Sequence, residues 1–260
     1  MPVVRYGDYA DGADYSPRIW GHLGVENNPD RWNEIKDHFA AGLDLAASGS
    51  QGKWYGFIDT SDTIKTEEAQ KNGAVVIATH ATDNNGPCIA GSVTGANFAF
   101  QSGLPLAFEA RWEVDSIATV SYFVGLAEEA RAVDNGLFPD TQTAVADIDY
   151  VAFSVLGDTA ASTVNFGYTT SGSTDVVAKA AAHTLVAGTY VKTGFRYDPY
   201  WDKIIAYVNG VPVAGQTTVR RGTTTFPDGE EMTVYAGLKN GSGAAREMTV
   251  CFMRCACAIW

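Results

Sequence analysis

From residue 54 onward, the hydrophobic positions form short runs that Gly, Asn, Asp and Pro interrupt. Runs rich in Val, Ile, Thr, Tyr and Phe and bounded by turn residues predict β-strands. We expect strands at 74–79, 97–100, 106–114, 119–126, 150–156, 163–169, 175–178, 190–197, 203–208, 232–238 and 248–258. Many short strands at close spacing, with few helical windows, are typical of a sandwich or jelly roll.

The turns between these runs support the same fold class. Asn209-Gly210 separates two apolar runs by two residues, which favours the tight turn of a β-hairpin. The chain shows no internal repeat and no low-complexity linker. We therefore predict an all-β protein: a two-sheet antiparallel jelly-roll sandwich over 54–260, with an N-terminal arm and one short helix in 1–53.

The helix is expected at about 29–41. Asn28 can cap it, and Pro29 suits its first position. Trp32, Ile35 and Phe39 recur at helical spacing on one face. The pattern predicts a short helix that packs on a sheet.

Residues 1–28 follow neither a strand period nor a helix period. Large aromatic side chains are unusual in a disordered tail. We therefore predict an ordered arm on its own domain or on a neighbouring subunit, with a partner interface formed by Tyr6, Tyr9, Tyr15 and Trp20.

The charge balance narrows the class of partner. The chain has 18 Lys and Arg against 30 Asp and Glu, a formal net charge of −12. A protein that binds nucleic-acid phosphates needs clustered Lys and Arg, so we expect no nucleic-acid partner. No run of roughly 20 apolar residues and no secretory signal pattern is present, so we expect neither membrane insertion nor secretion.

The cysteines lack the spacing of a zinc site. Cys88 stands alone, whereas Cys251, Cys255 and Cys257 occupy alternate positions near the C-terminus. Alternate residues of a strand share a face, so the pattern predicts a core strand with small apolar thiols. A disulfide or a metal site is the alternative, and the redox state of the three thiols stays open.

The order of motifs resembles the concanavalin A-like lectin/glucanase (LamG-like) jelly roll, in the form found in structural proteins of tailed-phage virions. The likeness covers roughly residues 54–260. It rests on Phe108-Glu109-Ala110, on 122–127, 149–153, 192–197 and 206–210, and on Phe226-Pro227-Asp228. The resemblance implies two antiparallel sheets packed face to face. Members of this family include sugar binders, glycosidases and inert decorations of virions, so the fold does not settle the function.

A glycosidase needs two carboxylates that flank the scissile bond. Glucan-hydrolysing relatives resemble each other in a Glu-x-Asp-x-x-Glu strand, which this sequence lacks. Its nearest approximations are Glu109, Glu113 and Asp115, and Asp147 with Asp149. In 108–114 the even positions are apolar, which places Glu109 and Glu113 on a polar face with Arg111 between them. Arg111 would hold both carboxylates ionised, so we predict no catalytic residue.

Two groups of Asp and Asn residues are candidate calcium ligands, and two aromatic pairs are candidate sugar contacts. Asp83, Asn84 and Asn85, or Asp198 and Asp202, supply oxygens but no recognisable calcium loop, and turns explain both groups. We predict neither a metal nor a cofactor. Tyr200 and Trp201 suit either a sugar ring or a partner protein, and Trp54 and Tyr55 carry the same ambiguity.

These observations favour a non-enzymatic bacteriophage virion protein. The expected role is a capsid decoration or cement protein, made in the host cytoplasm, that binds the major capsid protein or other virion proteins. We expect a homo-oligomer and guess a trimer from capsid symmetry. The alternative is a carbohydrate-binding module of a tail or fibre that engages a surface glycan through Tyr200 and Trp201. A glycosidase relative ranks third.

Overall fold

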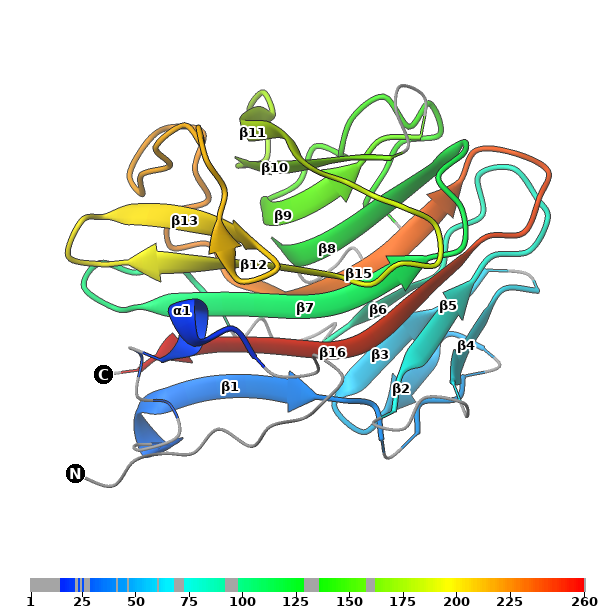
Figure 1. Ribbon diagram of the computed structural model, residues 1–260, viewed down its shortest axis with the longest axis horizontal. Helices are drawn as coiled ribbons and strands as arrows, with labels where there is room; N and C mark the ends of the chain where they lie inside the picture. The colour runs from blue at the N-terminus through cyan, green and yellow to red at the C-terminus, as the bar shows by residue number, and fades with distance from the viewer. Residues whose placement is uncertain are drawn as a thin grey trace.

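The computed structural model describes residues 15–21, 23, 25, 29–40, 42–45, 47–59, 61–67, 73–91, 98–128, 136–157 and 162–259. Two eight-stranded sheets pack face to face, and every pairing between neighbouring strands is antiparallel (Figure 1). The predicted two-sheet jelly-roll sandwich is confirmed. Within the described part of the chain, no helix has the length and apolar character to cross a membrane.

Sheet A runs in the order β14-β13-β12-β7-β16-β5-β4, and β1 pairs with β16 beside β5. Its strands are β1 (Trp32–Asp37), β4 (Thr63–Thr66), β5 (Val75–Ala78), β7 (Leu106–Val114), β12 (Val191–Asp198), β13 (Lys203–Val208), β14 (Val211–Pro212) and β16 (Glu247–Ala258). The predicted hairpin joins β13 to β14, and both turn residues, Asn209 and Gly210, have positive φ. This is the geometry for which Asn-Gly is selected.

Sheet B runs in the order β11-β10-β9-β8-β15-β6-β3-β2. Its strands are β2 (Gly49–Gln51), β3 (Trp54–Phe57), β6 (Cys88–Ala90), β8 (Val120–Glu128), β9 (Tyr150–Val155), β10 (Thr163–Thr169), β11 (Val176–Thr184) and β15 (Met232–Asn240). The short strands β2, β3, β4 and β6 escaped the sequence analysis because three or four residues carry too little alternation to identify.

The predicted helix at 29–41 is wrong. Pro29–Arg31 forms one 3-10 turn (η2), and Trp32–Asp37 then forms β1 on the edge of β16. Ile35 faces the core between the sheets while Trp32 packs on the opposite side, which is the alternation of a strand. Spacings of three and four residues had suggested a helix, but the edge of β16 offered backbone partners that a helix would have left unpaired. The one α-helix in the described residues is α1 (Pro17–Trp20).

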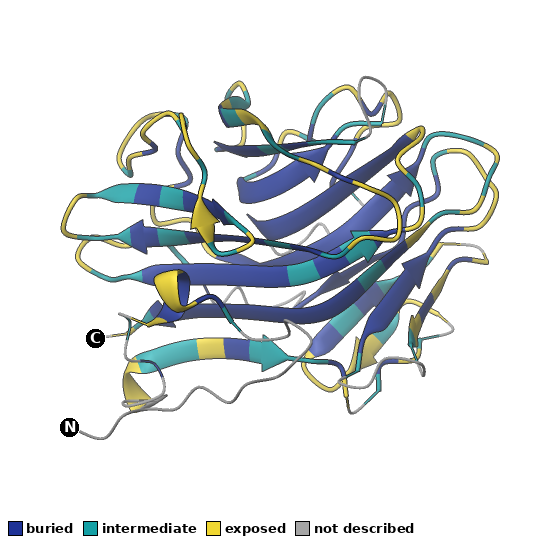
Figure 2. Cartoon of the chain, in the orientation of Figure 1, coloured by how far each residue is buried: buried dark blue, intermediate teal, exposed yellow. Residues whose placement is uncertain are grey.

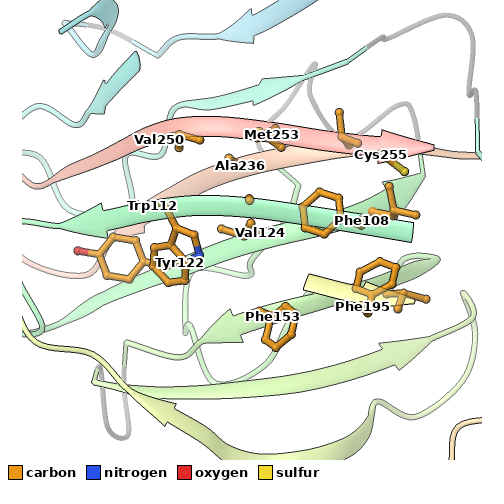
Figure 3. Packing of buried hydrophobic residues seen from close by; sticks show 14 of the residues in the cluster. Phe108, Trp112, Tyr122, Val124, Phe153, Phe195, Ala236, Val250, Met253 and Cys255 are labelled. Carbon is orange, nitrogen blue, oxygen red and sulfur yellow. The ribbon is translucent and has the colours of Figure 1, made fainter. Parts of the chain in front are cut away.

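Aromatic and β-branched side chains from both sheets fill the space between them. Phe108 and Phe195 stack with ring centroids 5.3 Å apart, and Phe195 lies 5.9 Å from Phe166 of sheet B (Figure 3). Cys255 and Cys257 face the same core, as predicted. Cys251 does not join that core, because a bulge between Val250 and Phe252 shifts the alternation. All four cysteines are buried thiols.

Replacing Phe195 with Ala tests this core. The substitution would leave a cavity where three aromatic rings now meet, so we expect the free energy of unfolding to fall by about 3–5 kcal/mol. Chemical denaturation measures the change. Val186→Ala, at an exposed site, is the matched control and should shift stability by less than about 0.5 kcal/mol. Equal effects of the two substitutions would contradict the packing described.

Candidate functional site

The outer face of sheet A, which points away from the core, carries the predicted polar residues of β7. Glu109, Arg111 and Glu113 alternate with the core residues of that strand, as expected. Glu109 is nevertheless only 1% exposed, although the sequence predicted a wet or partner-facing surface. The chain's own N-terminal segment covers it, since Ser16 and Trp20 bond its carboxylate. Figure 2 shows the short helix of this segment in front of the mostly buried β7.

This segment, residues 15–21, is called the strap. It contains α1, which lies across β7 in Figure 1. The backbone N–H of Ser16 and the indole N–H of Trp20 donate to Oε2 of Glu109 at 2.9 and 2.8 Å. The Ser16 hydroxyl contacts Oε1 of the same carboxylate. The strap thus satisfies both oxygens of a buried acid.

Burial raises the pKa of Glu109, while the hydrogen bonds from Ser16 and Trp20 and the charge of Lys192 lower it; the net direction is upward. Arg254 of β16 lies directly across from Glu109 in the sheet, but its Nε donates to Glu34 at 2.7 Å. Arg254 therefore pairs with Glu34, although it is the cross-strand neighbour of Glu109.

Aromatic contacts add to the strap's attachment. The Arg254 guanidinium lies 4.1 Å from the ring centroid of Trp20 and 4.7 Å from that of Tyr15. The Tyr15 hydroxyl bonds Nε2 of His38 at 2.9 Å, and its ring meets Phe252 edge to face at 4.8 Å. Such desolvated cation–π contacts contribute roughly 1–2 kcal/mol each.

Close approach of the strap requires a glycine on β12. A Cβ at Gly194 would lie 2.8 Å from Cδ1 of Ile19 and 2.6 Å from the carbonyl oxygen of Phe108. Ile19 is fully buried there. The missing side chain at Gly194 therefore leaves the space on β12 that Ile19 of the strap occupies.

The outer face of sheet B is covered as well. Leu137, Phe138, Val145 and Ile148, all from the segment 136–148, pack on outward residues of β6, β8, β9 and β15. Lys239 of β15 fastens this segment, since its Nζ donates to the Phe138 carbonyl at 3.0 Å and to Asp140 at 2.7 Å.

One pair of large aromatic side chains stands out into solvent. Tyr200 and Trp201, in the turn between β12 and β13, are 82% and 60% exposed. Their rings are perpendicular, with centroids 4.8 Å apart. Oδ1 of Asp198 accepts both backbone N–H groups, at 3.0 and 3.3 Å, and so fixes the turn. This aromatic tip lies at one end of the molecule's longest axis (Figure 1).

Of the residues predicted for the arm interface, Tyr15 and Trp20 lie next to each other, with ring centroids 6.1 Å apart. Tyr15 and Trp20 contact their own domain, whereas Tyr6 and Tyr9 lie outside the described residues. Trp54 is a core residue whose indole N–H donates to Asp37 at 2.7 Å, and Tyr55 packs against the covered face of sheet B.

The second carboxylate pair considered for a glycosidase, Asp147 with Asp149, and the candidate calcium ligands Asn85, Asp198 and Asp202 make hydrogen bonds within the chain. Asp147 and Asp149 accept backbone N–H groups of Gly172 and Ser171 at 2.7 and 3.0 Å. Asn85 donates to the buried Asp62 at 3.1 Å, and Asp202 accepts from Tyr197 at 2.8 Å. Among the described residues, no group of three or more His, Cys, Asp or Glu side chains is arranged to hold a metal ion.

Sequence reasoning missed Ser16, Arg254 and Lys239, which hold the covering segments. The sequence offered one signal for two of them, a basic residue in or beside a largely apolar predicted strand. Lys239 directly follows the predicted strand 232–238, and Arg254 lies within 248–258. A buried charge of this kind needs a partner, but the sequence does not say which residue supplies it.

No family model matches the chain, and no curated protein matches its sequence. Solved structures match its fold. A non-specific endo-beta-1,3(4)-glucanase from family GH16 gives a TM-score of 0.56 at 11% identity, over 88% of this chain and 92% of the glucanase. The endo-1,3-beta-glucanase of Streptomyces sioyaensis gives 0.53 at 13%, over 88% and 98%. Peanut lectin gives 0.52 at 14%, over 87% and 97%.

At these identities the likeness concerns the fold alone, which is the concanavalin A-like lectin/glucanase jelly roll. These neighbours include enzymes as well as a lectin, so the fold is compatible with sugar binding and with sugar cleavage.

We expect Glu109→Ala to destabilise the protein by about 1–3 kcal/mol, because three donors of the strap lose their acceptor. Glu113→Ala is the matched control: it removes a half-buried carboxylate from the same face of the same strand and should change stability by less than about 0.5 kcal/mol. Thermal unfolding of both variants measures the difference. Similar losses would show that the strap does not depend on Glu109.

Proposed function

We propose that this protein is a non-enzymatic structural component of a bacteriophage virion, a capsid decoration or cement protein that binds neighbouring capsid subunits. The observation that carries the proposal is the covering of both outer faces by the chain itself, while one rigid aromatic tip stays exposed. The resemblance to sandwiches of tailed-phage virion proteins gives the biological setting.

The covered faces weigh against turnover. A retaining glycosidase places two carboxyl groups about 5–5.5 Å apart across the substrate, and an inverting enzyme about 6.5–9.5 Å apart. Both oxygens of Glu109 are occupied by the strap, and its side chain is out of solvent. No sugar reaches this carboxylate while the strap is in place.

The aromatic tip suits adhesion to a neighbour. Binding energy at protein interfaces concentrates in a few Trp, Tyr and Arg side chains that enter a pocket on the partner. Tyr200 and Trp201 are already fixed by Asp198, so little further ordering of this turn is needed on binding. In this proposal the tip contacts the major capsid protein or another virion protein, and the sandwich acts as a homo-oligomer, a trimer in the simplest case.

A second candidate rests on the same tip and on the fold. The side chains of Tyr200 and Trp201 are 82% and 60% exposed, and aromatic rings of this kind stack on sugar rings. The structural neighbours include a lectin. A carbohydrate-binding module of a tail or fibre would use these residues to hold a host glycan.

Particle occupancy tests the first proposal. We expect Trp201→Ala to lower occupancy on purified virions at least tenfold at limiting protein, because an interface anchor is worth about 2 kcal/mol or more. Quantitative mass spectrometry of the particles measures occupancy, and a particle reconstruction locates the chain. Val211→Ala, 57% exposed at a different turn, is the control and should bind normally. Absence of the wild-type chain from virions would overturn this proposal.

A glycan array separates the two candidates. The structural role predicts no binding across the array, whereas the glycan module predicts signals that Trp201→Ala removes and Val211→Ala leaves intact. Release of reducing sugar from β-glucans, if lost in Glu109→Gln, would contradict both proposals.

A further inference from the structure

The strap and Glu109 are held together by non-covalent contacts alone, because they lie far apart in the sequence. Ser16 lies 93 residues from Glu109 in the sequence, and Trp20 lies 89 residues away. Among the described residues, the groups that act on the pKa of Glu109 are Ser16 and Trp20 of the strap and the charge of Lys192. The strap's docking and the state of this carboxyl are therefore coupled.

We propose that the strap is a latch, closed by a proton that Glu109 shares with Ser16, which opens as the pH rises. The proposal does not rest on the proposed function, since it concerns contacts within the chain. It is carried by the burial of the Glu109 carboxyl beneath the strap, which penalises its charged form, and by the arrangement of strap groups around the two carboxyl oxygens.

The two oxygens have different surroundings. Oε2 accepts from two N–H groups, so it must remain an acceptor in either protonation state. Oε1 faces the Ser16 hydroxyl, which can either donate or accept. A proton on Oε1 can therefore be donated to Oγ of Ser16, and the hydroxyl then turns its own hydrogen away. Every heavy-atom contact of the latch survives protonation.

Charged groups from each neighbouring strand surround the latch. Lys192 and Arg196 come from β12, Arg254 from β16, Glu34 and Lys36 from β1, and Arg111 and Glu113 from β7 itself. The strap contributes Arg18, whose carbonyl oxygen accepts from Arg196 at 3.1 Å. Arg254 pairs with Glu34, and Arg196 lies 3.9 Å from Asp198. These ion pairs leave burial as the dominant influence on Glu109.

The direction of the pH dependence follows from that burial. In the closed latch the pKa of Glu109 lies above its ordinary value of 4.5, whereas in the open latch the exposed carboxyl returns towards that value. The closed state therefore binds the proton more tightly. Its extra stability is complete below the ordinary pKa and is lost as the pH rises through the raised pKa.

Fluorine NMR of 5-fluorotryptophan-labelled full-length protein tests the latch between about pH 4 and pH 9. The Trp20 line, assigned from Trp20→Phe, reports the latch, and the line of Trp112, buried in the core, reports the fold. In the wild type we expect the closed-to-open ratio to fall with rising pH, up to tenfold for each unit by which the closed latch raises the pKa of Glu109. The Trp112 line should stay constant.

Two matched variants assign the effect. Glu109→Gln mimics the protonated carboxyl, since its amide oxygen accepts from the two N–H groups and its NH₂ donates to Ser16. We expect its latch to stay closed over the whole range. Glu113→Gln should behave like the wild type. A wild-type latch that is independent of pH or opens on acidification, or a Glu109→Gln profile equal to that of the wild type, would overturn the proposal.

Discussion

The constraint on which the rest of the structure depends is that the central strands are buried on both faces. β8 is buried at every position but its last, and β15 is buried throughout. Two sheets can cover only one face of each other, so a two-layer sandwich would expose the apolar side chains of the second face to water at roughly 25 cal/mol per Å². Each sheet accordingly has a third layer: the strap on sheet A and the segment 136–148 on sheet B.

Both covering layers are attached by a buried ionisable side chain on a central strand. Glu109 of β7 accepts donors from the strap, and Lys239 of β15 donates to a carbonyl and a carboxylate of the 136–148 segment. A buried ionisable group without hydrogen-bond partners is costly, so each of these side chains makes its covering segment specific for one position. Apolar contact alone would allow the segments to slide, because hydrophobic burial has no direction.

The covered faces also shape the functional argument. The fold is shared with glucanases and a lectin, and in this chain segments of the chain itself pack on the outer faces of central strands in both sheets. In the proposed adhesive role, contact with a partner is made by the exposed features, above all the turn that carries Tyr200 and Trp201. The edge strands β14 and β11 are poor templates for a further strand. β14 has only two residues. The pairing of β11 is bulged, and its Ala178 carbonyl already accepts a hydrogen bond from the backbone N–H of Thr217.

Alternation determined much of the fold from the sequence alone. It placed β7, β10 and β13 at their observed bounds, and Asn209-Gly210 fixed the hairpin register, because these signals depend on neighbouring residues. The same local reasoning gave a helix at 29–41, where the edge of β16 instead imposed a strand. It also assigned Glu109 to a polar surface. Only the tertiary structure brought Ser16 and Trp20 to this carboxylate, since no local pattern records which distant segment will cover a face.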